Sequence, residues 1–369
     1  MAASILSIGT AVPPARVSQS AARDVFAAQP GLSRIAQRLV RAAFDASAIE
    51  HRNTVLADLA AVAAGASPVS GDGMPTAGAG GTILVPSTGA RNDAYVRLAP
   101  ALFAEASAQA LAEASVAPSD VTHVVTVSCT GMFAPGPDFR LVKDLGLPLS
   151  VERYHVGFMG CAAALPGLRA AARICAAQPE AVVLVAAAEL CTLHIRSSED
   201  PQQIVSASVF ADGAAAAVVS ARSFADGPRL ALDRFGTALT SEGETDMVWT
   251  IGDEGFDMVL TAEVPRIIGR EIRGAVSAFL GDEVPDVWAV HPGGRSVLDR
   301  VESGLELGPT ALDASRDVLR RQGNMSSATI LFILRDLLHA EGPDGERIAA
   351  LAFGPGLTVE SALLTRVSP

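Results

Sequence analysis

The chain has 369 residues, of which 49% are hydrophobic and 18% charged, and its formal net charge is −12. This composition excludes a disordered chain, and the acidic balance excludes a basic surface that coats nucleic acid. No apolar run approaches the ~20 residues of a membrane span, and the first 14 residues lack the basic start of a signal peptide. The four cysteines include no Cys-x-x-Cys pair, so we expect free thiols and a cytoplasmic protein.

The first third of the chain contains two helical patterns and one irregular segment. After a short apolar strand at 4–9, residues 31–49 predict a helix whose arginines at positions 34, 38 and 41 share one solvated face. Residues 65–82 are rich in Gly, Ala, Ser and Pro, which predicts a flexible surface loop without a catalytic role. A second helix is expected from about 97 to 114.

From residue 121 onward, apolar segments typical of buried strands alternate with helical ones. This alternation predicts an α/β architecture with a covered sheet. The predicted strands are 121–127, 181–187, 214–219, 287–290, 348–353 and 358–367, and the predicted helices are 162–177, 264–280, 315–322 and 328–339.

Two parts of the chain repeat the same sequence of features, which indicates an internal duplication. One buried strand delivers Cys129 just before a glycine, and another delivers His291 in the same way. Cys161 follows Cys129 by 32 residues, Asn324 follows His291 by 33, and each lies at the start of a predicted helix. We therefore expect two halves, residues 1–225 and 226–369, that bring Cys161 close to His291 and Asn324.

These three residues suit nucleophilic chemistry. At a helix start, unpaired backbone N–H groups and the helix dipole stabilise the thiolate of Cys161, and a nearby cationic histidine would add to this effect. His291 is held by a following proline, with two glycines that leave room for a ligand. Asn324 could be only a helix cap, but its amide beside an imidazole would also stabilise a thioester enolate. Cys175 and Cys191 suit a structural role.

The motifs Gly160-Cys161, His291-Pro-Gly-Gly and Gly323-Asn324-Met-Ser-Ser occur in the order and spacing of type III polyketide synthases, the chalcone synthase family. The chain resembles this family from about residue 85 to its end, and more loosely from residue 1. The resemblance implies a thiolase-like fold, a duplicated αβαβα arrangement of five layers, and a homodimer.

It also implies an acyltransferase that condenses coenzyme A (CoA) thioesters without a metal or other cofactor. Cys161 would hold the starter acyl group. His291 would keep Cys161 ionised and, with Asn324, would stabilise the enolate that forms when malonyl-CoA loses carbon dioxide.

The same resemblance assigns further residues to the substrate cavity and to CoA binding. Phe210 matches one gatekeeper phenylalanine, and the second falls near Phe256, with Met258 at the matching position. Arg52 and His51 resemble the family's basic CoA-binding segment, and the arginines at 34, 38 or 41 could contribute. The remaining expected cavity residues are Cys129 and Thr130, Ala134 at a position that crosses the dimer interface in plant members, and the scaffolding loop Phe353, Gly354, Pro355 and Gly356.

Within the family, the sequence around Cys161 and Glu189 is similar to bacterial enzymes, especially mycobacterial long-chain alkylpyrone synthases. The small residues Cys129 and Ala134 predict a tunnel for a medium- or long-chain fatty acyl starter, extended with two or three malonyl units. The expected product is an alkyl α-pyrone, with an alkylresorcinol as its rival. Two alternatives remain: a single-round synthase of the β-ketoacyl-carrier-protein synthase III kind, and a non-catalytic partner subunit.

Overall fold

The computed structural model describes residues 3–69, 74–224 and 226–368. Residues 70–73 of the predicted loop and residue 225 at the predicted boundary between the halves therefore lie outside the described residues. Within the described part of the chain, no helix is both long enough and apolar enough to cross a membrane.

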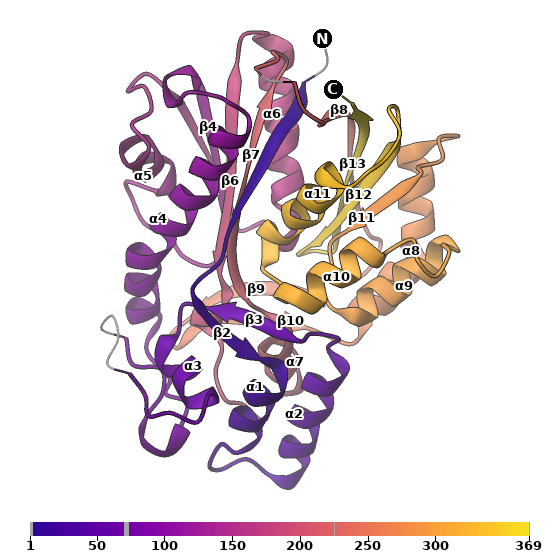
Figure 1. Cartoon of the computed structure of the whole chain (residues 1–369). Helices are drawn as coiled ribbons and strands as arrows, with labels where there is room; N and C mark the ends of the chain where they lie inside the picture. Colours follow the sequence, from indigo (N-terminus) through magenta and orange to yellow (C-terminus); the bar gives the residue numbers. More distant parts are fainter. Residues whose placement is uncertain (1–2, 70–73, 225, 369) are drawn as a thin grey trace.

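Nine strands form one mixed sheet in the order β11-β12-β13-β8-β1-β7-β6-β4-β5 (Figure 1). Two further antiparallel pairs, β2 with β3 and β9 with β10, form separate two-stranded sheets. The strands are β1 (Ser4–Ala11), β2 (Ala15–Ser18), β3 (His51–Thr54), β4 (His123–Ser128), β5 (Glu152–Gly157), β6 (Val182–Leu190), β7 (Asp212–Ser220), β8 (Arg229–Leu239), β9 (Met247–Gly252), β10 (Gly255–Leu260), β11 (Val287–Val290), β12 (Arg347–Gly354) and β13 (Thr358–Val367).

Helices cover both faces of this sheet and form the lower end of the molecule in Figure 1. The α-helices are α1 (Gln19–Ala27), α2 (Arg34–Ala46), α3 (Ala57–Ala63), α4 (Thr88–Glu113), α5 (Pro137–Asp144), α6 (Ala164–Ala177), α7 (Pro201–Val209), α8 (Glu263–Leu280), α9 (Arg295–Leu305), α10 (Asp313–Gln322) and α11 (Thr329–His339). Short 3₁₀ turns are η1 (Ala79–Gly81), η2 (Pro118–Asp120), η3 (Gly160–Ala162), η4 (Cys191–His194) and η5 (Ser326–Ala328).

The strand pairings are duplicated on the two sides of the β1–β8 contact. On one side, β1 pairs antiparallel with β7, β7 antiparallel with β6, and β6 parallel with β4. On the other side, β8, β13, β12 and β11 repeat the same two antiparallel pairings and one parallel pairing. The halves join where Ser4 faces Ala231 and Ile5 faces Leu230. The duplication expected from the sequence is thus present in the topology.

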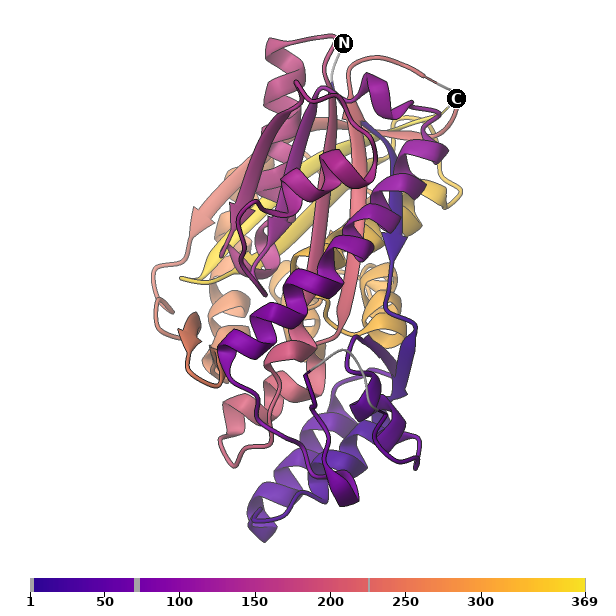
Figure 2. The same cartoon turned by 90° about the vertical axis from the view of Figure 1, so that its left-hand side faces the viewer.

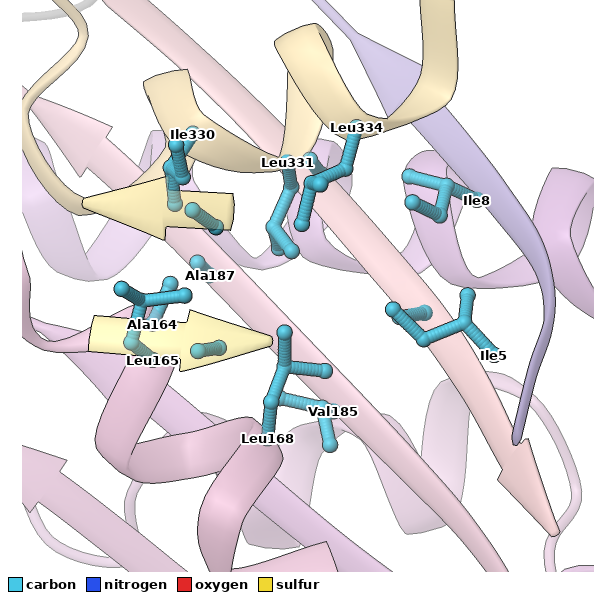
Figure 3. Close-up of a cluster of buried hydrophobic side chains, with 14 of the residues drawn as sticks. Ile5, Ile8, Ala164, Leu165, Leu168, Val185, Ala187, Ile330, Leu331 and Leu334 are labelled. Carbon is cyan, nitrogen blue, oxygen red and sulfur yellow. The ribbon is translucent and has the colours of Figure 1, made fainter. Parts of the chain in front are cut away.

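The middle layer consists of α6 and α11, which lie between the two halves of the sheet. Leu165 and Leu168 of α6 and Leu331 and Leu334 of α11 are fully buried in one apolar cluster. Figure 3 shows these side chains beside Ile5 of the first half-sheet. Burying an aliphatic side chain of this size contributes ~1.5–3 kcal/mol, so this layer stabilises both halves together.

The outer layers follow from the alternation of side chains along each strand. The face of the first half-sheet that points away from α6 packs on α4, whose diagonal course is visible in Figure 2. The outer face of the second half-sheet packs on α8, α9 and α10. The order of layers is therefore α, β, α, β, α, as the resemblance implied.

Several predicted elements are confirmed, and the helix predicted from about 97 to 114 is shorter than the observed α4. The strands at 287–290 and 358–367 have the predicted bounds, and the arginines at 34, 38 and 41 of α2 are exposed. The prediction for α4 was wrong at its start: the helix begins at Thr88, where the side chain of Ser87 accepts a hydrogen bond from the backbone N–H of Ala90. It continues through Pro100, whose place inside the helix weakened the sequence pattern.

Candidate active site

Cys161 lies in η3, a tight turn that leads from β5 into α6. Gly160 has a φ of 60°, and a Cβ atom there would lie 2.6 Å from Cδ of Pro355. Both features require glycine at this position. The turn therefore fixes the partly buried Cys161 immediately before the start of α6.

The segment 353–356 forms the other side of this turn. A Cβ atom on Gly354 would lie 2.8 Å from the carbonyl oxygen of Met159, so the two backbones are in close contact. The carbonyl of Pro355 accepts a hydrogen bond of 2.9 Å from the Thr358 hydroxyl, and Gly356 has a φ of 96°. This packing agrees with the scaffolding role that the sequence predicts for the loop.

His291 follows the last residue of β11, and its side chain is completely buried. Its backbone N–H donates to the carbonyl of Leu351 at 2.8 Å, which ties it to β12. Neither ring nitrogen has a hydrogen-bond partner among the described residues. Because buried polar atoms are normally satisfied, this imidazole is placed to bind a ligand.

Asn324 lies before η5 and α11, where it both caps the backbone and faces the cysteine. Its Oδ1 accepts the backbone N–H of Ser326 at 2.8 Å, and its Nδ2 donates to the carbonyl of Gly293 at 3.2 Å. An amide nitrogen has two N–H groups, so the second can serve a ligand. Sγ of Cys161 lies 4.0 Å from Oδ1 of Asn324. The backbone of Asn324 also forms a parallel bridge with Phe210.

One cavity of about 600 Å³ brings the three residues together. Cys161, His291 and Asn324 all line it, although they come from different parts of the duplicated fold. Phe210 and Met258 also line it, as the sequence predicts for gatekeepers, together with Phe353. The volume is in the range of small-molecule sites. The geometry is thus consistent with a shared site, while the catalytic roles of the three residues stay predictions.

A second, much smaller pocket of about 20 Å³ touches Cys161 from the side of β9 and β10. Cys129, Thr130 and Trp249 line it, and the indole N–H of Trp249 donates to the carbonyl of Cys129 at 2.8 Å. Phe256, the expected gatekeeper neighbour, does not line either pocket; its ring stacks on His194 at 4.1 Å.

The open acyl tunnel that we expected from small residues stays a prediction. Ala134, one of the two residues on which that expectation rested, is exposed on the surface and lines neither of these two pockets.

Burial opposes charge on both members of the predicted reactive pair. It raises the pKa of the Cys161 thiol to about 11 and lowers the pKa of His291 to about 3. This differs from the expected thiolate at neutral pH, because burial outweighs the stabilisation from the helix start. Burial therefore favours the neutral thiol of Cys161 and the neutral imidazole of His291.

Glu189 is a buried group that the sequence reasoning did not assign to the site. Its carboxylate accepts the backbone N–H of Cys129 at 3.0 Å, the hydroxyl of Thr130 at 2.8 Å and the hydroxyl of Ser327 at 2.5 Å. Burial raises its pKa. Glu189 thereby joins β6 to the end of β4 and to η5. The sequence signal that could have identified Glu189 is its position as a charged residue at the end of the otherwise apolar strand β6.

Arg52, the predicted CoA-binding residue, has partners inside the protein, and its binding to CoA stays a prediction. The side chain is buried, and its guanidinium donates to the carbonyls of Ala207 and Phe210, each at 2.7 Å. Burial also lowers its pKa to about 10. Arg52 holds the end of α7, where Phe210 lies. His51 is partly buried at the start of β3, and its role stays a prediction.

The duplicated five-layer fold, with a cysteine, a histidine and an asparagine in one cavity, defines a thiolase-like protein. Two family descriptions match the sequence: "Chalcone and stilbene synthases, N-terminal domain" over residues 1–223 and the corresponding "C-terminal domain" over residues 237–368. The chain therefore belongs to the chalcone and stilbene synthase family, whose type III polyketide synthases are acyltransferases.

Individual relatives agree with this assignment. "Probable polyketide synthase 1" of Dictyostelium discoideum is 32% identical over an alignment of 292 residues. The match covers 75% of this chain but 9% of that much longer protein. The C-terminal type III polyketide synthase domain of Steely1 from Dictyostelium is 27% identical, covers 100% of both chains and has a TM-score of 0.89. PKS-I from the brown alga Ectocarpus siliculosus is 28% identical over 99% of this chain and 98% of its own, with a TM-score of 0.89. The narrower likeness to bacterial alkylpyrone synthases stays a prediction.

Proposed function

We propose that this protein is a type III polyketide synthase that condenses malonyl-CoA repeatedly onto an acyl-CoA starter. The observation that carries the proposal is the meeting of Cys161, His291 and Asn324 in one cavity. Family membership supports the same reaction class.

In the proposed reaction, His291 takes the proton of Cys161, and the thiolate attacks the starter thioester. The C–S bond to CoA breaks, and the CoA thiolate leaves with the proton from His291. Malonyl-CoA then loses carbon dioxide, and the electron pair of the broken C–C bond forms an enolate. An N–H of His291 and the free N–H of Asn324 stabilise its oxygen. The enolate carbon attacks the acyl-cysteine carbonyl, the C–S bond breaks, and Cys161 is released for another round.

The reaction class is tested by incubating the purified protein with an acyl-CoA and labelled malonyl-CoA in the absence of carrier protein. We expect cyclised products that contain more than one malonyl-derived unit. A product with a single added unit, formed only with a carrier protein, would support the synthase III alternative instead. Complete absence of condensation would support a non-catalytic partner.

For the starter, we propose a medium- or long-chain fatty acyl group that is extended two or three times and released as an alkyl α-pyrone or alkylresorcinol. The 600 Å³ cavity supports this, because side chains of α7, β10 and α8 give it an extended apolar wall. These residues are Val205, Val209, Leu260, Val264 and Ile268. The 20 Å³ pocket beside Cys161 is small, and its size limits the length of the acyl chain that can enter on that side.

Trp249→Gly is therefore expected to favour longer starters. Removing the indole opens the 20 Å³ pocket, and each methylene that gains an apolar contact is worth ~1–3 kcal/mol in the transition state. We expect the ratio of kcat/KM for stearoyl-CoA over acetyl-CoA to rise at least roughly tenfold. Product mass spectrometry across starters from acetyl to stearoyl measures this.

The matched control is Trp288→Phe, a change at the second tryptophan of the chain, which is buried against α8 and α9 away from both pockets. It should leave the ratio unchanged. If wild type prefers acetyl-CoA and Trp249→Gly does not shift that preference, the fatty acyl starter is excluded.

We also propose a homodimer, and the edge of the sheet supports it. β5 is the last strand of the nine, pairs with β4 alone, and exposes the side chains of Tyr154 and His155. An exposed strand edge offers unpaired N–H and C=O groups to a second copy. Sedimentation velocity at micromolar concentration should give twice the mass of one chain, whereas a monomer at all concentrations would contradict the proposal.

A further inference from the structure

Three exposed arginines lie on one side of the mouth of the 600 Å³ cavity. Arg266 comes from α8, while Arg295 and Arg300 come from α9. Arg266 contacts Glu263, and Arg295 lies 3.5 Å from Asp299, which is also in the cavity wall. We call the surface formed by Arg266, Arg295 and Arg300 the lip of the cavity. Three cations beside one lining carboxylate make the lip locally positive in a chain whose net charge is −12.

Arg300 is the least neutralised of the three. Within the described part of the chain it forms no ion pair, whereas Arg266 and Arg295 each lie beside a carboxylate. Arg295 shares Asp299 with Arg316, which lies closer to that carboxylate, at 2.8 Å. Positive charge at the lip is thus left for an anion from solution.

The part of the cavity wall that comes from α2 is uncharged. There α2 contributes Ala43, Ala46 and Ser47, and none of its arginines lines the cavity. Arg52 is already used by backbone carbonyls inside the protein. The sequence predicts a CoA-binding charge at Arg52, whereas the exposed arginines that line this cavity belong to α8 and α9.

The start of α9 adds to the positive lip. Its N-cap is Gly294, so no side chain caps the first turn, and Gly294 and Ser296 both line the cavity. The first N–H groups of an 11-residue helix and its dipole favour an anion at this point. Deeper in the same cavity lies the buried His291, whose ring has no partner among the described residues.

We infer that Arg266, Arg295 and Arg300 bind the phosphate groups of CoA, with the start of α9, while the thioester reaches Cys161 at the inner end of the cavity. This inference rests on the proposed function. Arginine suits the task because its planar guanidinium binds phosphate oxygens in pairs.

The test compares two donors that differ in their phosphates, malonyl-CoA and malonyl-pantetheine, with one fixed starter. In Arg295→Gln/Arg300→Gln, we expect the KM for malonyl-CoA to rise roughly tenfold or more, while kcat stays within about twofold. The KM for malonyl-pantetheine, which has no phosphate, should not change. Arg266→Gln should give a smaller change of the same kind.

The matched control is Arg273→Gln, which alters an exposed arginine of α8 that pairs with Glu306 and does not line the cavity. It should leave both KM values unchanged. An equal rise for both donors in the double variant would overturn the inference, as would a CoA-specific rise in Arg38→Gln alone. A carrier-bound malonyl donor shares the phosphopantetheine chemistry, and lip variants that affect it but not malonyl-CoA would also overturn the assignment. If wild type turns over no donor, the proposed function itself fails.

Discussion

Replacing Cys161 by alanine is expected to lower product formation more than about 1,000-fold, because the nucleophile that holds the acyl chain is lost. Cys161 is partly buried in η3, lines the 600 Å³ cavity and lies beside Asn324. Product release from labelled malonyl-CoA measures the loss. Intact-mass spectrometry after acyl-CoA treatment should show an adduct on wild type and none on Cys161→Ala.

Cys175→Ala is the control for this variant. Cys175 is a buried residue of α6 that packs as a small apolar group. Its thiol lies 3.8 Å from the carbonyl of Val219. Its replacement should lower the free energy of unfolding by ~1 kcal/mol and preserve both the adduct and the product. Acylation of Cys161→Ala at Cys129 instead would contradict the assignment, since burial raises the pKa of the Cys129 thiol well above its usual range.

Replacing His291 by glutamine is expected to lower both decarboxylation and condensation roughly 100- to 1,000-fold. Glutamine keeps an N–H donor but accepts no proton from Cys161. Burial sets the pKa of that thiol to about 11, so at pH 7 only about one thiol in 10,000 would be ionised in the variant. Carbon dioxide release from malonyl-CoA and alkylation of Cys161 by iodoacetamide measure the two effects.

The pH dependence of Cys161 alkylation separates the role of His291 as proton acceptor from its role as N–H donor. In His291→Gln, the alkylation rate should rise about tenfold for each pH unit between 6 and 9, because only solvent removes the proton. Wild type should react faster at pH 7 and depend less steeply on pH. The control His339→Gln changes a half-exposed histidine of α11 that lies 3.0 Å from Glu113, and it should behave as wild type. Equal alkylation rates in wild type and His291→Gln would remove the histidine from proton transfer.

The architecture and the meeting of Cys161, His291 and Asn324 in one cavity could be predicted from the sequence, because both depend on regular patterns. Apolar strands, glycines before Cys161 and Asn324, and the two gaps of 32 and 33 residues are visible without a structure. The palindromic strand order then places the duplicated elements on either side of the β1–β8 contact. Residues that repeat in register along the chain thereby come to share one cavity.

The cavity wall and the charges at its mouth were less predictable, because they depend on contacts between distant segments. Arg52 follows a glutamate and a histidine in a polar stretch, and nothing local shows that carbonyls 155 and 158 residues away bind its guanidinium. Trp249 belongs to the β9–β10 pair, which the sequence pattern did not indicate, and its contact with Cys129 spans 120 residues.

The most direct test of the central claim is a pulse of acyl-CoA followed by a chase of malonyl-CoA, monitored by intact-protein and peptide mass spectrometry. We predict that the pulse acylates wild-type protein on the peptide that contains Cys161. The chase should then remove this adduct. Carbon dioxide and an elongated product should appear at the same time. An adduct on another residue, or an acyl-Cys161 that malonyl-CoA does not discharge, would contradict the account.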